Sequence, residues 1–224
     1  MVVKAEFERT VLLSIGICSL LAGIVVAIYL WDRPAEALLQ AKSGTPLLAL
    51  AELVGILGQP LPYITLGLLA LLFWGIILVN TGFSFSELLL PYRALLVLLA
   101  AVAPWTVALA LQAIFGRSRP HLYIERGIYT FHPFNLGPDF SSFPSSHAAV
   151  AAAMAAVFST FLPTYRLTFF VLAALVAVSR VAAGYHYPSD AVAGMLLGIV
   201  IVVALERGFD WVGIDIRGAK AKWR

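Results

Sequence analysis

Three polar clusters interrupt a chain that is otherwise strongly apolar, and each contains residue types that suit the chemistry of a phosphoryl group. In chain order they are Arg117-Ser118-Arg119-Pro120, Pro144-Ser145-Ser146-His147, and a longer cluster that extends from Ser179-Arg180 to His186 and Asp190. The planar guanidinium groups of Arg119 and Arg180 can each bind two phosphoryl oxygens, and they stay charged at any physiological pH. These two arginines are therefore predicted to bind phosphate.

The second cluster predicts a helix N-terminus that binds an anion. A proline and two serines directly precede an apolar run, and the free N–H groups at such a terminus favour a negatively charged group. Ser145 and Ser146 are accordingly expected to contribute to phosphate binding. His147 follows in the first turn, where its ring can give a proton to the oxygen that leaves phosphorus.

The third cluster supplies a candidate nucleophile. His186 and Asp190 are four residues apart, a spacing that lets a carboxylate on a helix, or at its first turn, hold one ring nitrogen. The other ring nitrogen then faces the substrate and can attack phosphorus. Taken singly, such polar residues have ordinary structural roles, which is how we interpret His121 and His132. Their combination in one chain favours a catalytic site.

Membrane helices are expected to position these clusters. Hydrophobic residues make up 61% of the chain and charged residues 12%, and the mean hydropathy is +0.93, values that exclude an ordinary water-soluble domain. The basic residues behind the net charge of +3 are scattered singly, which argues against nucleic-acid binding. The lipid bilayer is the expected partner, and residues 1–224 are expected to form one membrane domain. A single cysteine, Cys18, excludes an intrachain disulfide.

Six apolar stretches approach the length needed to cross a bilayer, which predicts an all-α, polytopic membrane protein with a bundle of six transmembrane helices. The predicted spans are residues 11–30, 63–79, 94–115, 147–162, 167–183 and 191–205. The distribution of Lys and Arg places both termini in the cytoplasm. All three polar clusters then fall at the outer face of a bacterial inner membrane.

Two further features of the apolar sequence bear on how the helices pack. The first outer loop contains an apolar segment, residues 46–57, that is interrupted only by Glu52. We expect this segment to lie in the interface or to re-enter the membrane, either covering the bundle or forming a wall of a lipid entrance. Gly194 and Gly198 form a GxxxG pattern in the last span, which is typical of close helix packing.

The order and spacing of the three clusters resemble the signature of the type 2 phosphatidic acid phosphatase superfamily, over residues 112–190. That signature is Lys-x6-Arg-Pro, Pro-Ser-Gly-His and Ser-Arg-x5-His-x3-Asp, and each motif has a counterpart here. The resemblance implies a membrane phosphatase in which His186 forms a phosphohistidine, Asp190 orients it and His147 protonates the leaving group. It also implies that phosphoryl oxygens are bound by Arg119, Arg180 and the Ser145-Ser146 segment.

Two positions depart from that signature. Gln112 stands where the family has lysine, and Ser146 stands where it has glycine. A serine N–H can still bind an anion, but the neutral amide of Gln112 gives no positive charge to the phosphoryl transition state. We expect Gln112 to contribute a hydrogen bond only, and Arg117 to supply the missing charge. The competing interpretation is that Arg117 is a snorkelling anchor at the helix end and that the site operates without this charge.

The expected function is an integral membrane phosphatase that hydrolyses a lipid phosphomonoester or lipid pyrophosphate without a metal or other cofactor. No set of His, Asp and Glu residues has the spacing of an independent metal site. The candidate substrates are a polyprenyl pyrophosphate, phosphatidylglycerol phosphate, phosphatidic acid and the 1-phosphate of lipid A, and the sequence does not select among them. Two alternatives stay open, a lipid-to-lipid phosphotransferase with the same site and a transporter. The oligomeric state is open as well.

Overall fold

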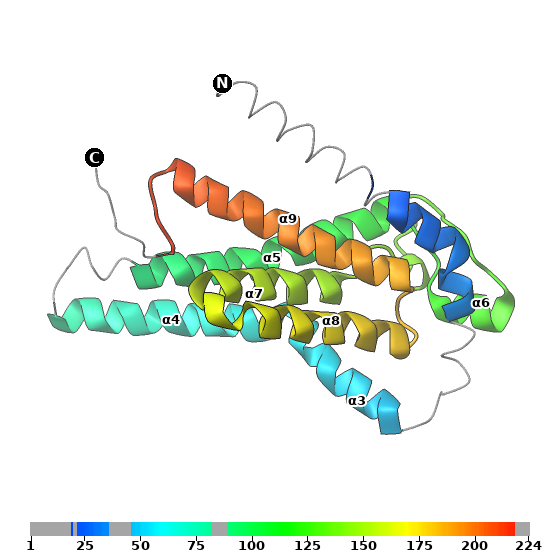
Figure 1. Cartoon of the computed structure of the whole chain (residues 1–224), viewed down its shortest axis with the longest axis horizontal. Helices are drawn as coiled ribbons and strands as arrows, with labels where there is room; N and C mark the ends of the chain where they lie inside the picture. Colours follow the sequence, from blue (N-terminus) through cyan, green and yellow to red (C-terminus); the bar gives the residue numbers. More distant parts are fainter. Residues whose placement is uncertain (1–18, 20–21, 36–45, 82–88, 218–224) are drawn as a thin grey trace.

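The computed structural model describes residues 19, 22–35, 46–81 and 89–217 (Figure 1). Most of these residues lie in helices, and the described part of the chain contains no β-strand. The elements are α3 (Pro46–Gly55), η1 (Ile56–Gly58), α4 (Pro60–Thr81), α5 (Leu89–Phe115), α6 (Pro120–Arg126), η3 (Pro138–Phe140), α7 (Ser146–Phe161), η4 (Pro163–Tyr165), α8 (Arg166–Ala182) and α9 (Pro188–Trp211). The prediction of an all-α fold is confirmed.

Four helical segments in the described ranges are long and apolar enough to cross a bilayer, namely Pro60–Asn80, Leu89–Phe115, Pro163–Ala182 and Pro188–Trp211. They correspond to four of the predicted spans. The predicted span at residues 147–162 is α7, which has 16 residues. At about 1.5 Å per residue it is about 24 Å long, shorter than the roughly 30 Å hydrocarbon layer. Half of the predicted span 11–30 lies outside the described residues, so the count of six is not confirmed.

The centre of the bundle is α7, which packs against α5, α8 and α9. Most of its residues are alanine or other small side chains, and most are buried, so the surrounding helices can approach its backbone closely. A Cβ atom at Gly194 of α9 would lie 2.3 Å from the carbonyl oxygen of Ser145, and one at Gly198 would lie 2.1 Å from that of Ala149. The prediction that the GxxxG pattern serves close packing is confirmed.

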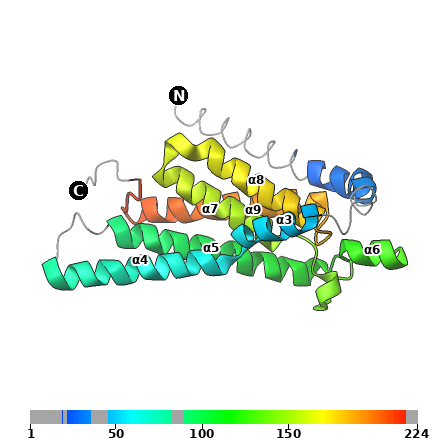
Figure 2. The ribbon, with the colours of Figure 1, turned by 90° about the horizontal axis from the view of Figure 1, so that it is seen from below.

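One end of the bundle gathers the chain segments that carry the polar clusters. The C-terminal ends of α5 and α8 and the N-terminal ends of α7 and α9 lie at this end, where α6 projects beyond the bundle (Figures 1 and 2). The segment from α3 to η1 reaches the same end, because α3 packs against α8 and η1 packs against α7. Residues from all three clusters and from α3 therefore lie close enough to form one site.

The turn after α5 depends on a glycine. Gly116 has φ +55°, and a Cβ atom there would lie 1.7 Å from the carbonyl oxygen of His132. Only glycine combines this backbone conformation with so close an approach. The turn ends α5 at Phe115 and directs the Arg117–Arg119 segment across the end of the bundle.

Candidate active site

A cavity of about 260 Å³ lies at this end of the bundle and is lined by polar side chains from four segments of the chain. Its wall is formed by Glu52, Arg119, Ser146, His147, Arg180, Tyr185 and His186. The cavity thus contains both predicted catalytic histidines and both predicted phosphate-binding arginines. Two guanidinium groups beside two imidazole rings can hold a phosphoryl group and transfer it.

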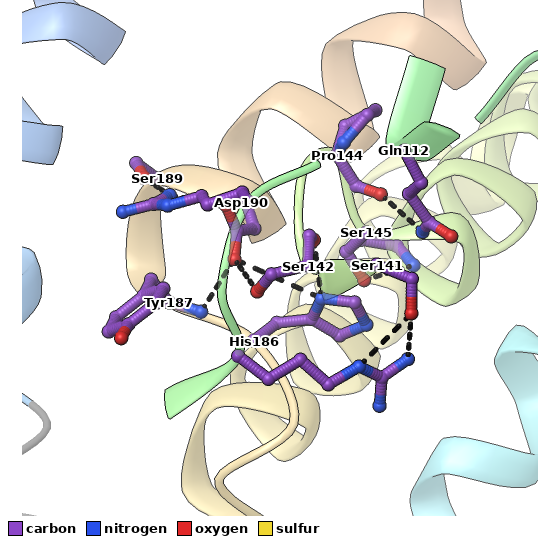
Figure 3. A network of polar contacts seen from close by, with 12 residues as sticks. Gln112, Ser141, Ser142, Pro144, Ser145, His186, Tyr187, Ser189 and Asp190 are labelled. Atoms are coloured by element: carbon purple, nitrogen blue, oxygen red, sulfur yellow. Dashed lines mark hydrogen bonds and ion pairs between the residues drawn. The ribbon is translucent and has the colours of Figure 1, made fainter. Parts of the chain in front are cut away.

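The ring of His186 is held by a backbone carbonyl group. Its Nδ1 atom lies 2.8 Å from the carbonyl oxygen of Ser142 (Figure 3). A carbonyl oxygen can only accept a hydrogen bond, so Nδ1 carries the proton and Nε2 keeps its lone pair. Burial of the ring, with a further contribution from the charge of Arg119, lowers the pKa of His186 to about 3. The ring is therefore neutral at physiological pH, as a nucleophile must be.

Asp190 supports His186 less directly than the spacing predicted. Its Oδ2 atom is 3.9 Å from His186 Nδ1, which is too long for a hydrogen bond. The same oxygen accepts hydrogen bonds from the hydroxyl of Ser142 at 2.6 Å and from the backbone N–H of Tyr187 at 2.9 Å. Figure 3 shows Ser142 between the two residues. Asp190 thus fixes Ser142, and Ser142 fixes the ring, which corrects the expectation of a direct contact.

The guanidinium group of Arg119 is positioned by the loop before α7. Its Nε and Nη2 atoms donate to the hydroxyl of Ser141 at 3.3 and 3.0 Å, and that hydroxyl donates to the carbonyl oxygen of Pro138 at 2.7 Å. Arg119 is also the residue immediately before α6, which begins at Pro120. Burial lowers the pKa of Arg119, but a guanidinium group remains charged at any physiological pH.

At the start of α7, the two serines have different roles. The hydroxyl of Ser145 accepts a hydrogen bond from the N–H of Ala148, so Ser145 caps the helix. Ser145 is fully buried and does not line the cavity, whereas Ser146 and His147 do. Ser146 therefore lies at the cavity and Ser145 acts as the cap that holds the terminus, while anion binding by this terminus stays a prediction.

Arg117 does not lie at the cavity, contrary to the expectation that it replaces the missing lysine charge. It is fully buried and forms ion pairs with Asp190 and, at 2.6 Å, with Asp32. It also donates to the hydroxyl groups of Ser189 and Tyr129, both at 2.7 Å. Its charge is neutralised by two carboxylates, so it joins the third cluster to the segment around Asp32 instead of binding phosphate.

Gln112 also has a structural partner. Its Nε2 atom donates to the carbonyl oxygen of Pro144 at 2.8 Å (Figure 3), and the side chain does not line the cavity. Gln112 therefore holds the loop before α7 against α5. Gln112 was expected to donate its hydrogen bond at the phosphoryl group, whereas here the amide donates to the backbone of the second cluster.

Four residues at or near the site were not singled out from the sequence. Glu52 and Tyr185 line the cavity, Ser142 holds His186 through its backbone, and Asp32 holds Arg117 and the N-terminus of α9. Glu52 had a detectable signal, because an isolated carboxylate in an apolar segment marks a candidate functional residue. The role of Ser142 had none, since a backbone carbonyl is common to every residue type.

A metal ion was not expected, and the described ranges contain no group of three or more His, Cys, Asp or Glu side chains that could hold one. The positive charge in the cavity comes from arginine side chains.

Known proteins resemble this chain in both sequence and fold. Residues 91–213 match the model of the PAP2 superfamily. A "Lipid A 1-phosphatase" of Rhizobium johnstonii is 31% identical over 208 residues, which cover 91% of this chain and 83% of that protein. A protein of the same name from Rhizobium etli is 39% identical over 88 residues, covering 39% of this chain and 38% of that protein.

Two crystal structures share the fold. One is Aquifex aeolicus LpxE, with a TM-score of 0.56 and 23% identity over 80% of this chain and 96% of that one. The other is a transmembrane PAP2 type phosphatidylglycerolphosphate phosphatase from Bacillus subtilis, with a TM-score of 0.55 and 24% identity over 87% and 96% of the two chains. These likenesses support the helical arrangement described above.

Proposed function

Because this chain belongs to the PAP2 superfamily, we propose that it is an integral membrane phosphatase that removes phosphate from a lipid by way of a phosphohistidine at His186. The observation that carries this proposal is the hydrogen bond from His186 Nδ1 to the carbonyl oxygen of Ser142 at 2.8 Å. It leaves the lone pair of Nε2 available in a cavity that also contains Arg119, Arg180 and His147. A neutral imidazole beside two fixed positive charges suits nucleophilic attack on a phosphate dianion.

The reaction proceeds in two steps. In the first, Nε2 of His186 forms a bond to phosphorus, the bond from phosphorus to the lipid oxygen breaks, and the protonated form of His147 gives its proton to that oxygen. Arg119, Arg180 and the N–H groups at Ser146 stabilise the charge on the three remaining oxygens. In the second, water attacks phosphorus and gives a proton to His147, the N–P bond breaks, and inorganic phosphate leaves. Both histidines end in their starting states.

Among the candidate substrates, we propose the 1-phosphate of lipid A. This choice rests on the Rhizobium johnstonii protein, whose similarity extends over 91% of this chain and so includes the outer segments as well as the motifs. We further propose that the protein resides in a bacterial inner membrane with the site at the outer face, and that turnover needs no metal. Arg119 and Arg180 would supply the charge that a divalent ion supplies in other phosphatases.

A panel assay tests this function. Purified protein is given lipid A, phosphatidylglycerol phosphate, phosphatidic acid and a polyprenyl pyrophosphate, and released phosphate is measured with and without excess chelator. We expect the highest kcat/KM with lipid A, with loss of the 1-phosphate, and no effect of chelator. The His186→Ala variant should release no phosphate, whereas His121→Ala, which changes a half-buried histidine outside the cavity paired with Asp139, should behave as wild type.

The same assay addresses the alternatives. Phosphate that appears on an added acceptor lipid instead of in solution would identify a phosphotransferase. Normal phosphate release by His186→Ala would overturn the proposed mechanism, and activity that is lost with chelator and restored by one divalent ion would overturn metal independence. Ion flux in liposomes without any phosphatase activity would favour a transporter.

A further inference from the structure

Glu52 places a negative charge in a cavity whose proposed substrate is an anion. The carboxylate of Glu52 lies 3.6 Å from Nη2 of Arg180, and it interacts with the hydroxyl of Tyr185, whose pKa it raises. All three residues line the same cavity as His147 and His186. A carboxylate at this position opposes phosphate binding unless it moves or is compensated.

The segment that carries Glu52 is fitted closely around the Arg180 guanidinium group. Nη2 of Arg180 donates to the carbonyl oxygen of Ala51 at 2.7 Å, and a Cβ atom at Gly55 would lie 1.8 Å from Nη2. The guanidinium carbon also lies 5.4 Å from the centre of the Tyr185 ring. Arg180 thus keeps contacts with α3 that do not depend on the Glu52 carboxylate.

The two charged partners differ in their exposure. The side chain of Arg180 is 5% exposed, whereas that of Glu52 is 46% exposed. Glu52 can therefore move into water at a low cost in free energy, while Arg180 is fixed. Within the described ranges, the hydrogen bonds of Arg180 use Nε and Nη2, so Nη1 is available to a phosphoryl oxygen.

We propose that Arg180 exchanges Glu52 for a phosphoryl oxygen when the substrate binds, and that Glu52 thereby sets the affinity of the site for phosphate. The inference rests on the proposed function, in which Arg180 binds the phosphoryl group. With Glu52 in place, its carboxylate offsets one of the two arginine charges that line the free cavity. The competing carboxylate limits the affinity for inorganic phosphate, and so it favours release of the product.

The test is equilibrium binding of inorganic phosphate to the full chain in detergent, measured by calorimetry without any lipid. Glu52→Gln should bind phosphate about three- to fivefold more tightly than wild type, the effect expected for loss of a half-exposed ion pair. In lipid assays the same variant should show stronger product inhibition by phosphate. Glu125→Gln is the matched control, because it removes one negative charge from an exposed position on α6 and should leave phosphate affinity unchanged.

Weaker or unchanged phosphate binding by Glu52→Gln would overturn the exchange, because it would mean that Glu52 only holds Arg180 in place. An equal gain in affinity in Glu125→Gln would also overturn it, by attributing the effect to overall charge. The binding result can be read without catalysis. If the wild-type protein hydrolyses none of the lipids, and Glu52→Gln still binds phosphate more tightly than wild type, the proposed function is contradicted and the exchange is not.

Discussion

Arg117 of the first polar cluster is ion-paired with Asp190 of the third, at a depth where neither side chain reaches solvent. A second carboxylate, that of Asp32, binds the other terminal nitrogen of the same guanidinium group at 2.6 Å. Asp32 also accepts hydrogen bonds from the backbone N–H and the hydroxyl of Ser189 at 3.0 and 2.5 Å. This network joins the segment around Asp32, the turn after α5 and the start of α9. It ends at Ser142, whose carbonyl oxygen contacts the ring of His186, the proposed nucleophile.

Removing Arg117 should therefore destabilise the protein. Arg117→Ala leaves the buried carboxylates of Asp32 and Asp190 without their cation, at a cost of roughly 3 to 5 kcal/mol. We expect a lower Tm together with a loss of phosphate release. Gln112→Lys should not rescue this variant, because Gln112 faces the carbonyl oxygen of Pro144. Rescue of kcat/KM by the added lysine would instead show that Arg117 supplies charge to the phosphoryl group.

Ser141 and Ser142, two adjacent serines in the loop before α7, should give different kinetic effects when each is changed to alanine. Ser142→Ala removes a hydrogen bond to the buried carboxylate of Asp190, worth about 1.5 to 3 kcal/mol, and should lower kcat because the loop that holds His186 loosens. Ser141→Ala frees the side chain of Arg119 and should mainly raise KM. Steady-state kinetics on one substrate compare the two variants. A main effect on KM in Ser142→Ala and on kcat in Ser141→Ala would contradict the site described here.

His186, the proposed nucleophile, should stay active well below neutral pH. The pKa of His186 is lowered to about 3, so kcat/KM for a soluble phosphomonoester, corrected for substrate ionisation, should show no loss from protonation of His186 near pH 6.5. In the unfolded chain this residue binds a proton below about pH 6.5, whereas in the folded protein it binds one only near pH 3. His186 therefore makes the free energy of unfolding fall as the pH drops through this window. A pH profile of Tm that is identical in wild type and His186→Ala would contradict a buried, neutral ring.

Glycine at position 55 should be required for the position of Arg180. The Cβ atom of Gly55→Ala would overlap the guanidinium group, and displacement of a phosphate ligand by about 1 Å can reduce the rate up to about 100-fold. We expect kcat/KM to fall while the helical content measured by circular dichroism is retained. Gly75→Ala in α4 is the matched control, because no heavy atom lies within 4 Å of the added Cβ. An active Gly55→Ala enzyme would show that Arg180 does not need its present position.

Labelling of single cysteines in a Cys18→Ser background would test the proposed orientation. Leu136→Cys lies in the loop at the site end and Trp211→Cys at the end of α9, and both positions are highly exposed, at 83% and 88%. In spheroplasts, an impermeant thiol reagent should modify the cysteine at 136 and leave that at 211 unmodified until the membrane is broken. The opposite pattern would place the site in the cytoplasm.

Much of the outline could be predicted from sequence because it depends on local patterns. Apolar runs of membrane length predict helices wherever they occur, since an unpaired backbone group in lipid is costly. Short motifs such as Pro144 to His147 combine a helix start with reactive side chains, so their chemistry could be predicted from neighbouring residues. The roles expected for Arg119, Arg180, His147 and His186 agree with their common position at the cavity.

The tertiary structure decided which polar groups meet. Arg117 and Arg119 are two residues apart and are the same residue type. Arg117 is nevertheless buried between two carboxylates, whereas Arg119 lines the cavity. That difference depends on Asp32, 85 residues away along the chain, and on how α9 packs. Glu52 likewise meets Arg180 only because α3 packs against α8. Hydrogen bonds and ion pairs form between atoms that are close in space, so a single sequence determines the available groups, and the packing of the helices determines their partners.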